Sequence, residues 1–313
     1  MNDQPITRKA LTRSTLELVL AFALLYVVWG STYLAIRIAV RTLPPFTVGG
    51  VRFMIAGAVP LAVLRARGVP WPSKLELRNA AIVGGCLMLG GNGLVGWAEQ
   101  TVSSSLAALL VSITPMWFVT FEALRPGGQR PTRRTALGLM VGFLGVAYLI
   151  GPDNVRRDLG APPIVGLCAL LFASTSWAFG SLFGKYSARP KSLWMTSALQ
   201  MLCGGALLVA SGALLGEPAR LTRAALTPAA LGSVGYLIVF GSWLGYGSYT
   251  YLLDRVTPAS LGTYAFVNPL VAVLLGVWLL GEPLTASMGW AGMLILTGVV
   301  IVQLPIERWL ARR

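Results

Sequence analysis

Residues 29–37 read WGSTYLAIR and residues 177–185 read WAFGSLFGK, so the chain contains nearly the same pattern twice. Each stretch begins with a tryptophan in an apolar run, continues through small and hydroxylated residues, and reaches a lone basic residue eight positions later. Trp29 and Trp177 are 148 residues apart, as are Arg37 and Lys185. A fixed offset of this kind predicts an internal repeat, which must be sought before any fold is assigned.

The repeat extends over most of the chain. VRFMIAGA (51–58) lies over LQMLCGGA (199–206) at the same offset, and SSSLAALLVSITP (103–115) lies over TPASLGTYAFVNP (257–269) at an offset of 154. GLMVGFLGVAYLI (138–150) also resembles GWAGMLILTGVVI (289–301). We therefore expect two related repeats, residues 16–151 and 162–305, joined by a linker at 152–161.

The composition predicts a membrane protein. Hydrophobic residues make up 55% of the chain and charged residues 12%, whereas soluble domains carry about 25% charged residues. Ten apolar segments come near the roughly 20 residues that cross a bilayer as a helix. Their approximate spans are 16–36, 46–64, 79–98, 104–124, 135–151, 162–184, 192–215, 228–252, 258–280 and 287–305. The expected fold is an all-α polytopic membrane protein with ten transmembrane helices.

Five helices in each half would place the second half in the membrane with the opposite orientation. Many secondary transporters use inverted repeats of this kind to form two alternative openings around one site near the midplane. The first segment follows three basic residues, but its apolar run is long and lacks a clear small-residue cleavage site, so we interpret it as a retained helix rather than a signal peptide.

The basic residues favour one side of the membrane. With the alternation above, 18 of the 25 Lys and Arg residues lie in the connections on the side of the N-terminus and 6 on the other side. The positive-inside rule then places both termini in the cytoplasm. No basic stretch outside the membrane is interleaved with aromatic residues, so we expect no nucleic-acid partner despite the net charge of +14.

Several kinds of chemistry are excluded or disfavoured. Histidine is absent, which removes histidine-based catalytic triads and histidine zinc sites. Cys86, Cys168 and Cys203 lie inside apolar segments without CxxC spacing, which favours packing over a metal site. GSLFGKY (180–186) falls short of a phosphate-binding loop. We therefore expect no cofactor, no metal and no enzymatic activity. A membrane-embedded enzyme and a sensor or assembly subunit are the alternative interpretations.

WGSTYLAIRIA at residue 29, ASTSWAFGSLFGK at 173 and TPASLGTYAFVNPLVAVLLGVWLLGEPLT at 257 resemble the EamA-type drug/metabolite transporter superfamily, most closely its YedA-like branch. The similarity covers about residues 18–304. The resemblance implies a ten-helix transporter of the bacterial inner membrane, commonly an exporter of amino acids or other small metabolites. The first half departs from the pattern at RPGGQRPT (125–132), where the second half has GEPLT (281–285).

Candidate pathway residues begin with the repeated tryptophans. Residues at i, i+4 and i+8 share one face of a helix. Two such stripes are Trp29, Tyr33 and Arg37 in the first half, and Trp177, Ser181 and Lys185 in the second. The two cations favour interfacial anchors. The tryptophans lie deeper, which favours a cavity lining.

Polar residues within the apolar segments are costly to expose to lipid, so Asn92 and Asn268 should face the interior. Asn268 precedes Pro269 and Thr114 precedes Pro115, so the fourth helix of each half carries a proline that frees a backbone carbonyl beside a polar side chain. These prolines could act as hinges or as purely structural kinks.

Arg52 lies inside the second segment, where a charge costs about 2.5–3.5 kcal/mol at the bilayer centre, so it should point inward or snorkel. Its counterpart in the second half is Gln200, so the charge is not needed for the fold of each half. A role in substrate binding or gating and snorkelling to the membrane surface are the two interpretations of Arg52. Tyr264 lies one turn before Asn268 on the same face. Further aromatic candidates, which packing also explains, lie at 97, 117, 246, 249 and 251.

These residues lead to one functional hypothesis. A small amphipathic or aromatic substrate is expected to bind between helices one and six, against Trp29 and Trp177, with Asn268 supplying hydrogen bonds. No carboxylate is expected at mid-membrane, so facilitated diffusion, exchange and proton antiport are all open. GLMVG (138–142), GSLFG (180–184) and GSWLG (241–245) are GxxxG patterns, which favour close helix packing within the bundle or a homodimer.

Overall fold

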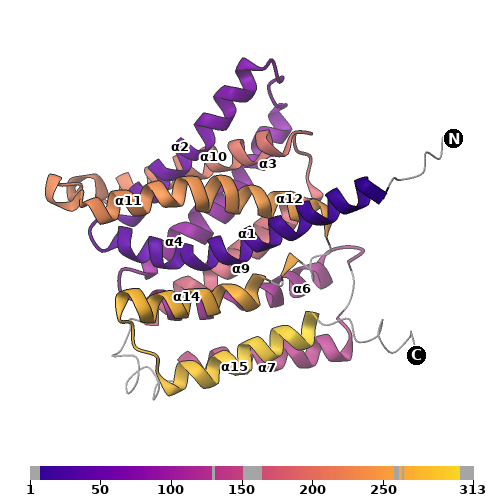
Figure 1. The fold of residues 1–313 in the computed structure, drawn as a ribbon, viewed down its shortest axis with the longest axis vertical. Helices are drawn as coiled ribbons and strands as arrows, with labels where there is room; N and C mark the ends of the chain where they lie inside the picture. The colour runs from indigo at the N-terminus through magenta and orange to yellow at the C-terminus, as the bar shows by residue number, and fades with distance from the viewer. Residues whose placement is uncertain (1–7, 129–130, 151–163, 257–260, 263, 304–313) are drawn as a thin grey trace.

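The chain folds into a bundle of helices, and the computed structural model describes residues 8–128, 131–150, 164–256, 261–262 and 264–303. No strand occurs among these residues. Most helices lie side by side, and α1 begins at the end of the bundle where α15 ends (Figure 1). The α-helices are α1 (Arg8–Val40), α2 (Pro45–Ala66), α3 (Lys74–Gly84), α4 (Leu94–Ala98), α5 (Ser104–Val111), α6 (Thr114–Leu124), α7 (Arg133–Ile150), α9 (Ile164–Tyr186), α10 (Leu193–Leu214), α11 (Pro228–Tyr236), α12 (Gly247–Arg255), α14 (Tyr264–Leu280) and α15 (Ala286–Gln303).

Many of these helices are long and apolar enough to cross a membrane. Seven such stretches occur in the described residues, and two shorter apolar helices cover Val267–Leu280 and Ala286–Ile301. The seven are Leu16–Val40, Pro45–Ala66, Lys74–Ala98, Ser104–Leu124, Ile164–Tyr186, Leu193–Leu214 and Pro228–Arg255. The polytopic, all-helical class is thus confirmed. The linker expected at 152–161 lies outside the described residues.

Three of the expected spans are not uniform α-helices. The span at 79–98 contains the π-helix η1 (Gly85–Gly93), and the span at 228–252 contains the π-helix η4 (Leu237–Tyr246). The span at 104–124 is interrupted between α5 and α6. Apolar periodicity indicates a helix but does not reveal these changes in winding, because π segments keep the chain helical while shifting which side chains face inward.

Polar side chains accompany both π segments. In η1 the Asn92 amide donates to the Leu87 carbonyl at 3.3 Å, and in η4 the Ser242 hydroxyl donates to the Leu237 carbonyl at 3.1 Å. Each bond reaches back five residues. π segments inside α-helices occur frequently at functional sites.

The two prolines sit in different contexts. Pro115 lies in the first turn of α6, and the hydroxyl of Thr114 donates to the Val111 carbonyl at 2.6 Å, the carbonyl that the proline cannot bond. Pro269 instead lies inside α14, which continues past it. The polar side chain expected beside a freed carbonyl is therefore present at Thr114. The two halves differ at the proline, because the helix of the first half is interrupted just before Pro115, whereas α14 is continuous through Pro269.

Helix pairs pack closely through glycine. α2 packs against α10, α7 against α15, α1 against α14, and α9 against η1. At the α2–α10 contact, a Cβ built on Gly57 would lie 2.6 Å from the Ala198 carbonyl oxygen. The glycines of the three GxxxG patterns for which contacts are described also face helices of the same chain: Gly142, Gly180, Gly184, Gly241 and Gly245. These glycines therefore bring helices together within the bundle.

Two buried glutamates cap helices far away in sequence. Glu217, at the start of the 3₁₀ turn η2 (Glu217–Arg220), accepts hydrogen bonds from the Phe46 and Thr47 backbone N–H groups and from the Thr47 hydroxyl, at the N-terminus of α2. Glu282, which follows α14, accepts four hydrogen bonds at the N-terminus of α5. Its donors are the backbone N–H and hydroxyl groups of Ser104 and Ser105, at 2.6–3.0 Å. Negative charge is favoured at a helix N-terminus, so each carboxylate ties two helices together.

The outer surface of the bundle is apolar. On α14, for example, Leu274 is 69% exposed and Trp278 is 81% exposed, and α2 exposes Val51, Ile55 and Val59. Soluble monomers rarely expose contiguous apolar patches of more than a few hundred Å². Side chains of this kind around the bundle are what a lipid-facing surface requires.

Candidate binding cavity

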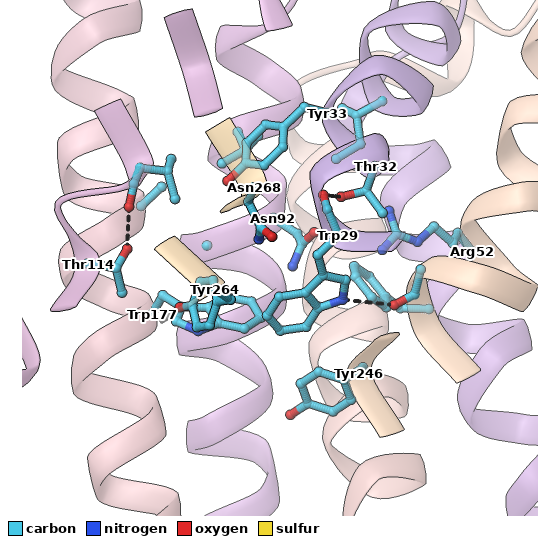
Figure 2. Close-up of a pocket in the computed structure, with 17 residues that line it drawn as sticks. Trp29, Thr32, Tyr33, Arg52, Asn92, Thr114, Trp177, Tyr246, Tyr264 and Asn268 are labelled. Atoms are coloured by element: carbon cyan, nitrogen blue, oxygen red, sulfur yellow. Dashed lines mark hydrogen bonds between the residues drawn. The ribbon is translucent and has the colours of Figure 1, made fainter. Parts of the chain in front are cut away.

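A cavity lies among the helices and collects residues from both halves of the chain. Its empty space is about 690 Å³, including the part continuous with solvent. The wall is mostly apolar and aromatic (Figure 2). The lining residues are Trp29, Thr32, Tyr33, Ile36, Arg52, Phe53, Gly91, Asn92, Val95, Val111, Thr114, Ala173, Trp177, Gly241, Tyr246, Tyr264 and Asn268.

The two repeated tryptophans meet at this cavity. The rings of Trp29 and Trp177 lie edge to face with centroids 5.3 Å apart. Trp29 also stacks on Tyr249 at 5.0 Å and meets Tyr264 edge to face at 5.6 Å. Its indole N–H donates to the Gly241 carbonyl of η4 at 3.3 Å (Figure 2). Aromatic contacts of this kind fix ring orientation, so the tryptophans form a rigid wall.

Glycines in the π segments make room for these rings. A Cβ on Gly245 of η4 would lie 2.4 Å from the Trp29 Nε1 atom, and one on Gly91 of η1 would lie 2.8 Å from the Trp177 ring. Each tryptophan thus packs on a π segment of the other half. Any larger residue at either glycine would push a tryptophan out of its present position.

Asparagine side chains supply the neutral polar part of the wall. The Asn92 amide nitrogen donates to Leu87, as described above. Asn268 is oriented so that its amide nitrogen donates to the carbonyls of Tyr264 at 3.3 Å and Tyr26 at 3.0 Å, which links α14 to α1. Because both NH₂ groups bond backbone carbonyls, the asparagines offer the cavity mainly their acceptor oxygens.

Arg52 is the charged residue of the wall. Its side chain is only 5% exposed, and its Nε donates to the Ser242 hydroxyl at 3.4 Å. The guanidinium also lies over the Phe53 ring, 4.2 Å from the centroid. Arg52 therefore points into the bundle, where it borders the cavity.

Eight of the predicted pathway residues line this one cavity: Trp29, Tyr33, Arg52, Asn92, Thr114, Trp177, Tyr264 and Asn268. Ser181 does not. It lies one turn along α9 from Trp177, where its hydroxyl accepts a hydrogen bond from Tyr249 at 2.7 Å, in a smaller neighbouring cavity. A stripe on one helix face extends beyond one cavity, so Ser181 lies further along the axis of α9 than the residues of the larger cavity.

Sequence reasoning missed other parts of the wall. Thr32 and Phe53 line the cavity, and neither is among the predicted pathway residues although they lie in the repeated stretches 29–37 and 51–58. Thr32 was detectable as a polar residue one turn from Trp29 within an apolar run. Phe53 looked like any core aromatic. Tyr246, one of the further aromatic candidates of the sequence, also lines the cavity.

One carboxylate is more deeply buried than its place at a helix end suggests. Glu99 follows α4 and is 0% exposed, and Arg37 donates to its backbone carbonyl. Neither carboxylate oxygen has a hydrogen-bond partner among the described residues. Burial raises the pKa of Glu99 well above its ordinary value, while the nearby Arg37 charge opposes that rise. The sequence favours Arg37 as an interfacial anchor, and in the structure Arg37 bonds the Glu99 backbone.

Comparison with known proteins gives consistent matches. The model of the EamA-like transporter family matches residues 17–151 and 164–304. The chain is 39% identical over 293 residues to "Uncharacterized inner membrane transporter YedA" of Escherichia coli (strain K12), covering 93% of this chain and 92% of that protein. It is 26% identical over 294 residues to "Probable amino-acid metabolite efflux pump" of the same strain, covering 89% and 92%.

Similarity to a solved structure extends the comparison to the fold. A crystal structure with 22% sequence identity matches with a TM-score of 0.66, covering 94% of this chain and 99% of that one. At this level of identity the likeness concerns the fold alone.

Proposed function

The chain belongs to the EamA-like transporter family and is a membrane transporter, and we propose that it moves a small amphipathic or aromatic metabolite, such as an amino acid or a related compound, outward across the bacterial inner membrane. Transport proceeds by alternating access, without a cofactor. The observation that carries this proposal is the cavity in which Trp29 and Trp177 meet, because it combines aromatic faces, neutral acceptors and a cation inside an apolar bundle.

An inverted pair of five-helix repeats, residues 16–151 and 162–305, is part of the proposal. Contacts between the halves come in corresponding sets that support it: α9 packs against η1, and α1 packs against η4. The π segments occur at corresponding places, and each faces the tryptophan of the other half. Inverted repeats give a transporter two related openings around one site.

The proposed orientation has both termini in the cytoplasm. The bias of Lys and Arg toward one set of connections supports it. The start of α1 and the end of α15 lie at the same end of the bundle, as an even number of crossings requires (Figure 1). Reporter fusions after Arg41 and Arg157 should then be external, and fusions after Arg67 and Arg189 internal. A map with an odd number of crossings would contradict the proposal.

The decisive experiment is transport into proteoliposomes with a panel of radiolabelled amino acids and aromatic metabolites. Trp29→Ala and Trp177→Ala should each weaken binding of the transported compound about 10-fold, since an aromatic contact contributes roughly 0.5–1.5 kcal/mol beyond the area it buries. Their combined effect should be non-additive, because the two rings touch each other. Trp278→Ala is the matched control, as Trp278 is 81% exposed on the outer surface of α14.

Unchanged affinity in both cavity variants would place the binding site elsewhere. Chemical conversion of a panel compound without translocation would instead favour a membrane-embedded enzyme. A protein that neither binds nor moves any compound of a wide panel would favour a sensor or assembly subunit.

A further inference from the structure

The cavity has an uncompensated positive charge. Of its 17 lining residues, Arg52 alone is charged. No carboxylate of the described residues pairs with Arg52, and its one side-chain bond, to Ser242, is long at 3.4 Å. A buried cation costs free energy unless it is paired or hydrogen-bonded. The site is therefore electrostatically incomplete without an anion.

The Arg52 guanidinium is also free to bind an anion. In the described chain only its Nε has a hydrogen-bond partner. The two terminal nitrogens have none, and they are not fully enclosed by protein atoms. Figure 2 shows the side chain extending from α2 toward Thr32 and Trp29. An arginine fork with two free terminal nitrogens matches the geometry of a carboxylate.

The remaining wall suits the rest of such a molecule but not an ammonium group. Trp29, Trp177 and Tyr264 provide aromatic faces and edges for a flat or apolar body. Asn92 and Asn268 offer neutral acceptors, which fit a hydroxyl or N–H group but carry no charge. Neither Asp nor Glu lines the cavity, so nothing neutralises a substrate cation beside Arg52.

We propose that the substrate class is a net-anionic carboxylate with an aromatic or apolar body, whose carboxylate binds the Arg52 guanidinium, rather than a zwitterionic amino acid or an amine. This inference rests on the proposed function and restricts its substrate from amphipathic or aromatic metabolites in general, amino acids included, to anionic carboxylates. The residue that corresponds to Arg52 in the second half supports a role for Arg52 in binding the substrate. Gln200, the counterpart of Arg52, is occupied by a 2.5 Å hydrogen bond from the Tyr246 hydroxyl and lies outside the cavity lining.

A matched series of three ligands tests the proposal: 3-phenylpropanoate, phenylalanine and phenethylamine share a phenyl ring and a short chain and carry net charges of −1, 0 and +1. Binding to the full-length protein in nanodiscs would be measured by calorimetry. We expect 3-phenylpropanoate to bind tightest and phenethylamine weakest. Arg52→Gln should weaken 3-phenylpropanoate about 10- to 100-fold, the range for a lost charged hydrogen bond, and phenethylamine far less.

Two further variants keep the test interpretable. Arg52→Lys retains the charge and should preserve the order of the three ligands even if Arg52→Gln cannot be purified. Arg223→Gln removes an exposed arginine outside the cavity and should change nothing. Equal or tighter binding of phenylalanine or phenethylamine, binding of none of the three, or an equal loss for all three in Arg52→Gln would overturn the proposal.

Transport assays separate this inference from the proposed function. If phenylalanine or another zwitterion is translocated and its affinity is independent of Arg52, the anion inference fails while the transporter stands. If no compound of any charge is translocated by protein that binds 3-phenylpropanoate through Arg52, the anion site stands while the transporter proposal fails.

Discussion

Trp29 and Trp177 lie in nearly equivalent surroundings, whereas Arg52 and Gln200 do not. Each tryptophan packs on a glycine of a π segment, Gly245 for Trp29 and Gly91 for Trp177. Arg52 faces the cavity, but Gln200 bonds a tyrosine beside it. The tryptophans therefore form the same frame in both halves, whereas the difference between Arg52 and Gln200 gives the cavity its charge.

The capping glutamates should show the largest effect on stability. Glu282→Gln is expected to lower the free energy of unfolding by about 3 kcal/mol, because four hydrogen bonds to a buried carboxylate are lost or weakened. Glu217→Gln should cost somewhat less, because it loses three. Thermal unfolding in detergent measures both. The exposed cap Glu76→Gln is the control and should cost under about 1 kcal/mol, and equal effects at all three would refute the ranking.

The same carboxylate predicts a pH dependence. Burial alone would raise the pKa of Glu282, but the donors of Ser104 and Ser105 outweigh it and hold the pKa below its ordinary value. A lowered pKa contributes stability that is complete above the ordinary value of about 4.3 and is lost as the pH falls through the lowered one. The melting temperature should therefore decrease as the pH is lowered below about 4, and this decrease should be less steep in Glu282→Gln. Identical profiles for both proteins would contradict this.

Packing at the α2–α10 contact should break the symmetry between two equivalent glycines. A Cβ on Gly57 would meet a backbone carbonyl at 2.6 Å, whereas one on Gly205 would meet its nearest atoms at 2.9 Å. Gly57→Ala should therefore destabilise by about 1–3 kcal/mol and Gly205→Ala by less. The yield of monodisperse protein and its melting temperature would report the difference. Gly232→Ala, with open space around it, should be neutral, and a larger loss at Gly205 would reverse the argument.

The smallest effect is expected at the ion pair between Arg189 and Asp254. Its side chains are 28% and 23% exposed, and such pairs contribute about 0–1 kcal/mol because water screens them. Asp254→Asn should thus shift the melting temperature only slightly, and less at high salt. Glu99→Gln is the variant for comparison, since that carboxylate is wholly buried and has no hydrogen-bond partner among the described residues. A larger melting-temperature shift for Asp254→Asn than for Glu99→Gln would show that the exposed fraction of a carboxylate does not predict its effect on stability.

Particular residues show how far sequence reasoning reached. Trp29 and Trp177 were selected from the repeat alone, and Asn92, Asn268 and Arg52 from the cost of placing polar groups in lipid. All five line one cavity. Ser181 lines the neighbouring cavity instead, because helical spacing gives a face but not the depth at which a cavity ends. Phe53 was missed, because an apolar side chain carries no sign that it borders a cavity.

By itself, the sequence determined that the chain is an all-helical membrane protein, that it repeats, and which polar residues point inward. These follow from local composition and from the high cost of leaving polar groups unsatisfied in lipid. Only the tertiary structure decided where the helices change to π winding, that Glu217 and Glu282 cap helices of the other half, and that Arg52 has no counter-charge while Gln200 is occupied. The contacts of Glu217, Glu282 and Arg52 join segments more than 100 residues apart along the chain, and the local sequence does not encode such contacts.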